Sequence, residues 1–121
     1  DRISLPGFLP LPWAYMQSAA LFVLSSRTEG LPTVLIEAMA HGTPVVSTDC
    51  PWGPSEILEG GKYGRLVDVD NVDAMAKAMK DALEEPIVNQ KELISRAMSY
   101  SYENSRKAYV STIEELENFN V

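Results

Sequence analysis

The sequence has few of the features that support disulfide cross-linking, membrane insertion or nucleic-acid binding. Its 121 residues include a single cysteine, Cys50, which permits no internal disulfide and suits a reducing compartment. No apolar run approaches the roughly 20 residues of a membrane span, and no basic-then-apolar signal opens the chain. Ten Lys and Arg against seventeen Asp and Glu give a net charge of -7, which repels phosphate backbones and anionic lipids. We therefore expect a soluble, cytoplasmic protein that does not bind nucleic acid.

The residues that are present predict one α/β domain over residues 1–121. Apolar residues make up 45% of the chain and charged residues 22%, which is ordinary globular composition. Short β-type runs at residues 3–5, 21–24, 45–47 and 65–69 alternate with helical patterns. The runs LFVL and PVV do not alternate with polar residues, which is typical of parallel strands buried on both faces. The predicted fold is a Rossmann-like, doubly wound parallel sheet of about four strands flanked by helices.

Helix boundaries are marked by capping residues. Pro12 suits the first turn of a short helix, and Pro32 suits the start of a second one that His41 and Gly42 would end. An Asx cap opens the helix before Pro86, Asn89 and Glu92 resemble a capping box, and Ser101 is expected to cap the last helix. We expect the apolar stripes of the last three helices to join the core, including Tyr102, Tyr109, Ile113 and Leu116 in the final one.

The segment EGLPTVLIE, residues 29–37, carries the predicted chemistry. It follows the strand LFVL and enters a helix, so the N–H groups of Gly30, Leu31 and Thr33 face an anion site strengthened by the helix dipole. Glu29 precedes the helix and Glu37 lies about one and a half turns inside it, with its side chain leaning back toward the helix start. Carboxylates repel phosphate and accept hydrogen bonds from hydroxyls. The predicted ligand is therefore a diphosphate with polyols on both sides, as in a nucleotide sugar.

The sequence around this segment resembles a known family. Residues 25–58, SSRTEGLPTVLIEAMAHGTPVVSTDCPWGPSEIL, are similar to the core motif of retaining glycosyltransferases of family 4, whose members have a GT-B fold and transfer sugars from nucleotide donors. The matching features are Ser26, the two glutamates with seven residues between them, EAMA followed by Gly42, the GP-x-E of residues 53–56, and a late GRLV.

The resemblance implies a role for each matched position. Glu37 would bind the ribose hydroxyls of the donor. Glu29, the expected catalytic residue, would bind hydroxyls of the transferred sugar. The N–H groups of Gly30, Leu31, Thr33 and Val34, with the Thr33 hydroxyl, would hold the diphosphate. The turn formed by Leu5, Pro6 and Gly7 would flank the nucleobase. UDP is the expected nucleotide, as UDP-hexose or UDP-N-acetylhexosamine, and the resemblance implies neither a metal nor any other cofactor.

The sequence also departs from the family pattern. Gly30-Leu31-Pro32 stands where many members have Gly-Phe-Gly, and Ala20 stands where an Asp is common. The family's basic pair and its N-terminal acceptor domain fall outside this sequence. We therefore expect a donor-side part of a two-domain enzyme that is inactive alone. The missing domain would meet a glycan or lipid-linked acceptor and make any contact with the cytoplasmic face of a membrane.

Two other functions remain open at this level: a sugar-nucleotide epimerase of the same fold, and a non-catalytic α/β binding module. Several single residues also have open roles. We expect His41 to cap its helix and Cys50 to be a small packed residue. Trp52 could stack on a sugar ring or cover the core, and core packing is expected. Arg27 could approach phosphate, but solvation is expected. Ser55 and Glu56 are equally compatible with capping a helix and with touching the donor sugar.

Overall fold

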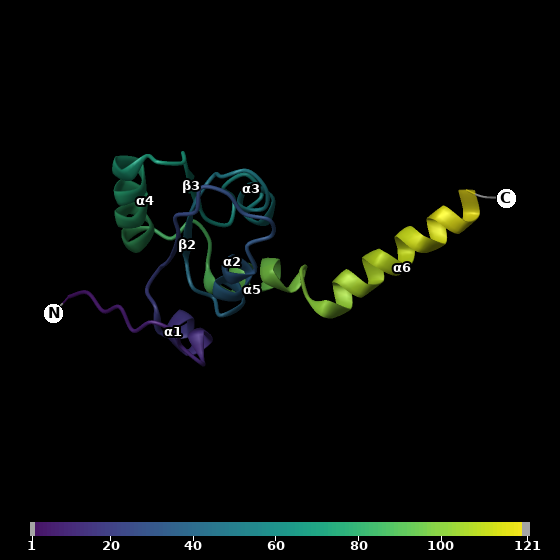
Figure 1. Ribbon diagram of the computed structural model, residues 1–121, viewed down its shortest axis with the longest axis horizontal. Helices are drawn as coiled ribbons and strands as arrows, with labels where there is room; N and C mark the ends of the chain where they lie inside the picture. The colour runs from purple at the N-terminus through teal and green to yellow at the C-terminus, as the bar shows by residue number, and fades with distance from the viewer. Residues whose placement is uncertain (1, 120–121) are drawn as a thin grey trace.

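A computed structural model describes residues 2–119 of the chain, which form a three-stranded parallel sheet with helices packed against it (Figure 1). The strands are β1 (Phe22–Leu24), β2 (Val45–Thr48) and β3 (Arg65–Val67), in the order β1-β2-β3. The helices are α1 (Pro12–Ser18), α2 (Thr33–Ala40), α3 (Pro54–Ile57), α4 (Val72–Glu84), α5 (Gln90–Met98) and α6 (Tyr102–Phe119). The predicted α/β class and the parallel sheet are confirmed.

The central strand β2 separates two layers of helices. All four of its residues are buried, as the sequence predicts for a strand covered on both faces. Successive strand residues point to opposite faces. Accordingly, Val45 joins the core formed with α2 and α5, whereas Val46 packs with Ala78 and Ala82 of α4.

The predicted helix caps are present. The Asn71 side chain accepts a hydrogen bond from the Ala74 N–H, and Asn89 and Glu92 form the reciprocal capping box. The Ser101 hydroxyl accepts a hydrogen bond from the Asn104 N–H at 3.3 Å. Gly42 follows α2 with a φ of 75°, a conformation that favours glycine. Local sequence therefore determines where these helices begin and end.

The prediction of a strand at residues 3–5 is wrong, and the sheet has three strands rather than about four. Ile3 is 81% exposed and Leu5 92% exposed, and no strand lies beside them within the described part of the chain. An apolar run becomes a strand only where a neighbour accepts and donates its backbone hydrogen bonds. The sequence of the run cannot supply that neighbour.

The core stripe predicted for the last helix is also wrong. Helix α6 forms, but none of its described residues is buried, and it extends away from the rest of the fold (Figure 1). Tyr109 is 74% exposed and Ile113 is 55% exposed. In α5, by contrast, Leu93 and Ala97 are buried as predicted. Among residues 2–119, no helix is both long and apolar enough to cross a membrane.

Candidate functional site

The three parallel strands end at one edge of the sheet, and the loops that follow them meet there. The loop after β1, residues 25–32, leads into α2, and the loop after β2, residues 49–53, leads into α3. Ligands of open α/β sheets bind at this carboxyl edge. The segment EGLPTVLIE therefore lies where the sequence predicts it.

The start of α2 offers unused hydrogen-bond donors. No hydrogen bond within residues 2–119 uses the N–H groups of Gly30, Leu31 or Val34. The fourth predicted donor differs, because the Thr33 N–H already donates to the Leu31 carbonyl at 2.8 Å. The helix tip thus presents three free N–H groups, and the helix dipole adds partial positive charge there.

Glu29 is half-buried and held in place by the loop around it. The Ser26 hydroxyl donates to its carboxylate Oε1 at 2.6 Å, and the Glu29 N–H donates to the Pro51 carbonyl at 3.4 Å. The Thr48 hydroxyl at the end of β2 in turn donates to the Ser26 carbonyl at 2.5 Å. One carboxylate oxygen therefore has a fixed partner while Oε2 has none among the described residues. No role was predicted from the sequence for Ser26 or Thr48. The Thr48 bond depends on how β1 and β2 align, whereas the Ser26 bond to Glu29 spans only three residues of one loop.

Glu37 lies on the open face of α2. It is exposed, and among the described residues its carboxylate has neither a hydrogen-bond nor an ion-pair partner. Residues three and four positions apart share a helix face, so Glu37 lies on the same side as Val34 and Thr33. Leu35 and Met39 are buried, whereas Val34 is 38% exposed. The open face of α2 thus carries a carboxylate, a hydroxyl and an apolar side chain near the free N–H groups.

Leu5, Pro6 and Gly7 lie in an exposed segment before α1. Gly7 has a φ of 71°, so the chain turns there in a conformation that favours glycine. No hydrogen bond among the described residues joins this turn to the start of α2. The predicted role beside a nucleobase stays a prediction.

The loop after β2 packs directly against the start of α2. A Cβ atom added to Gly53 would lie 2.4 Å from the Pro32 Cδ atom and 3.1 Å from the Gly30 carbonyl oxygen, and Gly53 has a φ of +102°. Only glycine fits such an approach without displacing its neighbours. Gly53 precedes α3, which has no side-chain cap, so capping by Ser55 or Glu56 is excluded.

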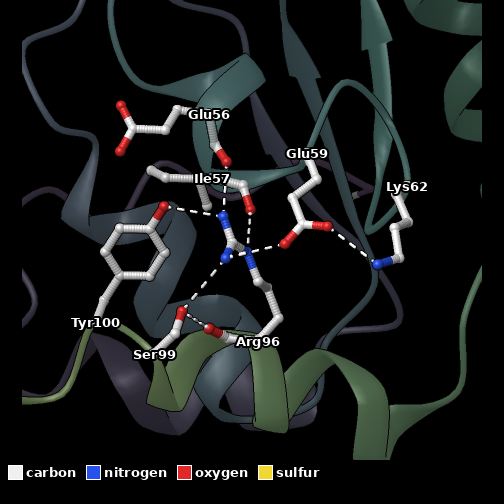
Figure 2. Close-up of polar contacts among 7 residues, drawn as sticks. All are labelled: Glu56, Ile57, Glu59, Lys62, Arg96, Ser99 and Tyr100. Carbon is white, nitrogen blue, oxygen red and sulfur yellow. Dashed lines mark hydrogen bonds and ion pairs between the residues drawn. The ribbon is translucent and has the colours of Figure 1, made fainter. Parts of the chain in front are cut away.

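Arg96 of α5 fixes the other end of α3. Its guanidinium points into the fold and donates to the Ile57 carbonyl at 2.9 Å and to the Glu56 carbonyl at 2.7 Å (Figure 2). It also forms an ion pair with Glu59 at 3.1 Å and donates to the Tyr100 hydroxyl at 3.0 Å. Burial raises the pKa of the Tyr100 phenol, which keeps it protonated as the acceptor of this bond. The sequence carries no signal for this cluster, because its bonds join residues up to 40 positions apart.

Three further residues can now be placed. Cys50 is buried and 3% exposed, as predicted. Core packing for Trp52 is wrong, because this residue is 77% exposed. Arg27 is exposed as predicted, but it forms an ion pair with Asp70 at 2.8 Å, and this hydrogen bond raises the pKa of Arg27 above its ordinary value.

A hollow opens at the same sheet edge, beside β3 and α4. This cavity of about 180 Å³ is lined by residues that include Ser25, Thr48, Asp68, Asp70 and Val72. Asp68 and Asp70 have the Asp-x-Asp spacing of some metal sites, but Asp70 pairs with Arg27. Within residues 2–119, no three potential His, Cys, Asp or Glu ligands come together.

The fold and the helix tip define a class: a parallel α/β domain with an anion-accepting helix start at the carboxyl edge of its sheet. The family model described as "Glycosyl transferases group 1" matches residues 1–85, and the chain belongs to this family. It is 37% identical over 89 residues to an uncharacterized glycosyltransferase of Haemophilus influenzae, covering 73% of this chain and 25% of that protein.

Other relatives carry more specific names. The chain is 36% identical over 85 residues to N-acetylgalactosamine-N,N'-diacetylbacillosaminyl-diphospho-undecaprenol 4-alpha-N-acetylgalactosaminyltransferase of Campylobacter jejuni, covering 70% of this chain and 23% of that one. The structure of the lipopolysaccharide outer core galactosyltransferase WaaB aligns with a TM-score of 0.79 at 23% identity, over 91% of this chain and 32% of that one. This match shows the fold, which is that of a GT-B domain. The chain thus spans about a quarter to a third of the length of these proteins.

Proposed function

We propose that this chain is the donor-side part of a retaining family 4 glycosyltransferase and binds a nucleotide sugar, with UDP as the nucleotide, at the start of α2. The observation that carries the proposal is the set of three free N–H groups at the helix tip, flanked by Glu29 and Glu37. Backbone donors at a helix start suit a diphosphate. Carboxylates on either side suit the ribose and the sugar hydroxyls.

The proposed chemistry stabilises the leaving group. The bond between the anomeric carbon and the β-phosphate oxygen breaks, an acceptor hydroxyl forms the new bond to that carbon, and the hydroxyl proton passes to the departing phosphate oxygen. Negative charge grows on the departing diphosphate, where preoriented N–H groups of Gly30, Leu31 and Val34 and the Thr33 hydroxyl stabilise it. Glu37 binds the ribose, and the unused Oε2 of Glu29 accepts hydrogen bonds from hydroxyls of the transferred sugar. We propose no metal in this step.

The names of two relatives support a proposal for the acceptor and the cellular setting. The name of the Campylobacter jejuni relative includes a diphospho-undecaprenol acceptor, and that of a Salmonella typhimurium relative is lipopolysaccharide 1,6-galactosyltransferase. We therefore propose a glycan or lipid-linked acceptor, bound outside this chain, and cytoplasmic action at a membrane face. The role in surface-polysaccharide synthesis belongs to the same proposal.

Titration calorimetry with UDP and with UDP-hexoses tests the function. Binding is expected to be weak, because Arg27, the basic side chain on the loop before α2, is held by Asp70. Glu37→Ala should weaken UDP binding by at least about tenfold, since hydrogen bonds to a charged acceptor contribute about 1.5–3 kcal/mol and about 1.4 kcal/mol is a factor of ten. Glu29→Ala should leave UDP binding unchanged and reduce discrimination among UDP-hexoses.

Glu114→Ala is the matched control, because it removes the same charge from an exposed position on α6. It should bind every ligand like the wild type. If a folded sample gives no heat with any nucleotide, the non-catalytic binding module is favoured. If both Glu37→Ala and Glu29→Ala bind like wild type, the assigned roles are wrong.

A further inference from the structure

Trp52 stands out by its exposure and its backbone conformation. It lies in the loop after β2, at the carboxyl edge of the sheet, and is 77% exposed. Its φ is 67°, in the left-handed region where a bulky residue is a rare outlier. The left-handed conformation brings the Cβ atom of a non-glycine residue too close to the following carbonyl oxygen, so it is strained. Both the solvent exposure of the side chain and the left-handed backbone conformation are therefore unfavourable for a tryptophan at this position.

The neighbours of Trp52 hold it in this conformation and beside the proposed site. On one side, the Pro51 carbonyl accepts the hydrogen bond from the Glu29 N–H. On the other side, Gly53 lies against Gly30 and Pro32 at the start of α2. Both flanking residues contact the segment that carries the free N–H groups. The loop therefore exposes the Trp52 indole to solvent, one residue away from the Pro51 carbonyl that binds the Glu29 N–H.

Fold stability does not explain this arrangement. A buried tryptophan removes about 150–250 Å² from water, and an exposed one loses most of that gain. Glycine would adopt the same φ without strain. Strained residues that persist in a well-fixed loop cluster at ligand-binding sites. An exposed, strained aromatic at a ligand-binding edge thus points to a ligand.

We propose that the Trp52 indole is a stacking surface for a hexopyranose ring bound beside Glu29. The inference rests on the proposed function and adds a residue that selects the sugar. The face of an aromatic ring carries negative charge density, and the C–H groups of one pyranose face carry partial positive charge. Glu29 binds hydroxyls at the ring edge, and Trp52 covers the apolar face. The ring belongs either to the donor or to the acceptor, which have the same chemistry.

The test uses tryptophan fluorescence. The chain has two tryptophans, Trp13 and Trp52, so Trp13→Phe leaves Trp52 as the only indole. This variant is titrated with UDP, with UDP-galactose, with UDP-N-acetylglucosamine, and with methyl galactoside in the presence of UDP. A blue shift with a UDP-hexose but not with UDP identifies the donor ring. A blue shift only on adding the methyl glycoside identifies an acceptor ring.

Calorimetry on variants separates stacking from folding. Trp52→Ala should bind a UDP-hexose about three- to tenfold more weakly while binding UDP unchanged. Trp52→Phe should recover much of the loss. Trp52→Gly relieves the strain, so its melting temperature should equal or exceed that of wild type although sugar affinity falls. Trp13→Phe, a change at a tryptophan in α1, is the matched control and should bind like wild type.

Two negative results are distinguishable. If UDP binds, but Trp52 fluorescence is silent to every sugar and Trp52→Ala binds UDP-hexoses like wild type, the stacking inference is overturned and the proposed function stands. If UDP itself does not bind to the folded chain, the proposed function fails and the stacking inference fails with it.

Discussion

Replacing Arg96 with alanine should destabilise the fold far more than replacing the exposed Arg106 with alanine. The guanidinium donates to two backbone carbonyls of α3 and pairs with Glu59. Each charge-assisted bond contributes about 1.5 kcal/mol at the low end of its range. The partly exposed ion pair adds at most about 1 kcal/mol. Together these give a loss of about 3–4 kcal/mol in the free energy of unfolding.

This loss translates into a measurable change in melting temperature. At about 2.1 cal/mol/K per residue, 121 residues have an unfolding entropy near 0.25 kcal/mol/K, so the melting temperature should fall by roughly 14 °C. Circular dichroism during heating measures the melting temperature. Arg96→Lys keeps the charge but not the planar fork, and should recover about half of the loss.

Arg106→Ala is the matched control for this prediction. Arg106 lies on α6 and forms only an exposed ion pair with Glu103 at 3.6 Å, so its loss should cost less than about 0.5 kcal/mol. If Arg96→Ala melts within about 3 °C of wild type, the cluster in Figure 2 does not hold α3 in place. The reasoning from these contacts to stability would then be refuted.

Three smaller predictions concern the site loop and the surface. Gly53→Ala should lower the free energy of unfolding by about 2 kcal/mol or more and weaken UDP binding. Gly60 has a φ of +65° and no atom within 4 Å of an added Cβ, so Gly60→Ala should lower the free energy of unfolding by only about 1 kcal/mol and leave UDP binding unchanged. Urea unfolding measures the first effect and calorimetry the second. Ser26→Ala frees the Glu29 carboxylate and should reduce discrimination among UDP-hexoses without changing UDP affinity; equal loss of both would contradict a positioning role. A hydrogen bond from its lysine partner lowers the pKa of Asp81 below 3.8, so the carboxylate stabilises the fold above that pH and this contribution is lost as the pH falls through the lowered value. Asp81→Asn should therefore be less stable than wild type in urea at pH 7, and the two should become equal once the pH is well below the lowered pKa of Asp81; a difference that persists in acid would rule out this cause.

Local patterns in the sequence predicted the parts of the fold that depend on neighbours along the chain. The capping box of Asn89 and Glu92 and the cap at Asn71 form as expected, because each bond spans only three residues. The helix start at residues 30–34 was found in the same way. This helix start, which is the proposed diphosphate seat, was therefore predictable as a structural element, while its role as a binding site stays a prediction.

The remaining features depend on contacts between distant segments. Arg96 bonds to a carbonyl 40 residues away, and Gly53 approaches Pro32 from another loop. An apolar pattern also cannot tell whether a partner surface exists, which is why the stripe of α6 was wrongly expected in the core. Trp52 was wrongly expected to pack for the same reason. Hydrophobicity favours burial, but only the loop geometry decides whether burial is possible.

The most direct test of the central claim is the response of single backbone amides to UDP. Two-dimensional NMR of ¹⁵N-labelled chain detects weak binding and reports each N–H separately. The largest shifts should appear at Gly30, Leu31 and Val34, with smaller ones at Thr33, whose N–H is already hydrogen-bonded. Shifts confined to the cavity beside Asp70 and Val72, or no shifts from a folded sample, would contradict a diphosphate seat at the start of α2.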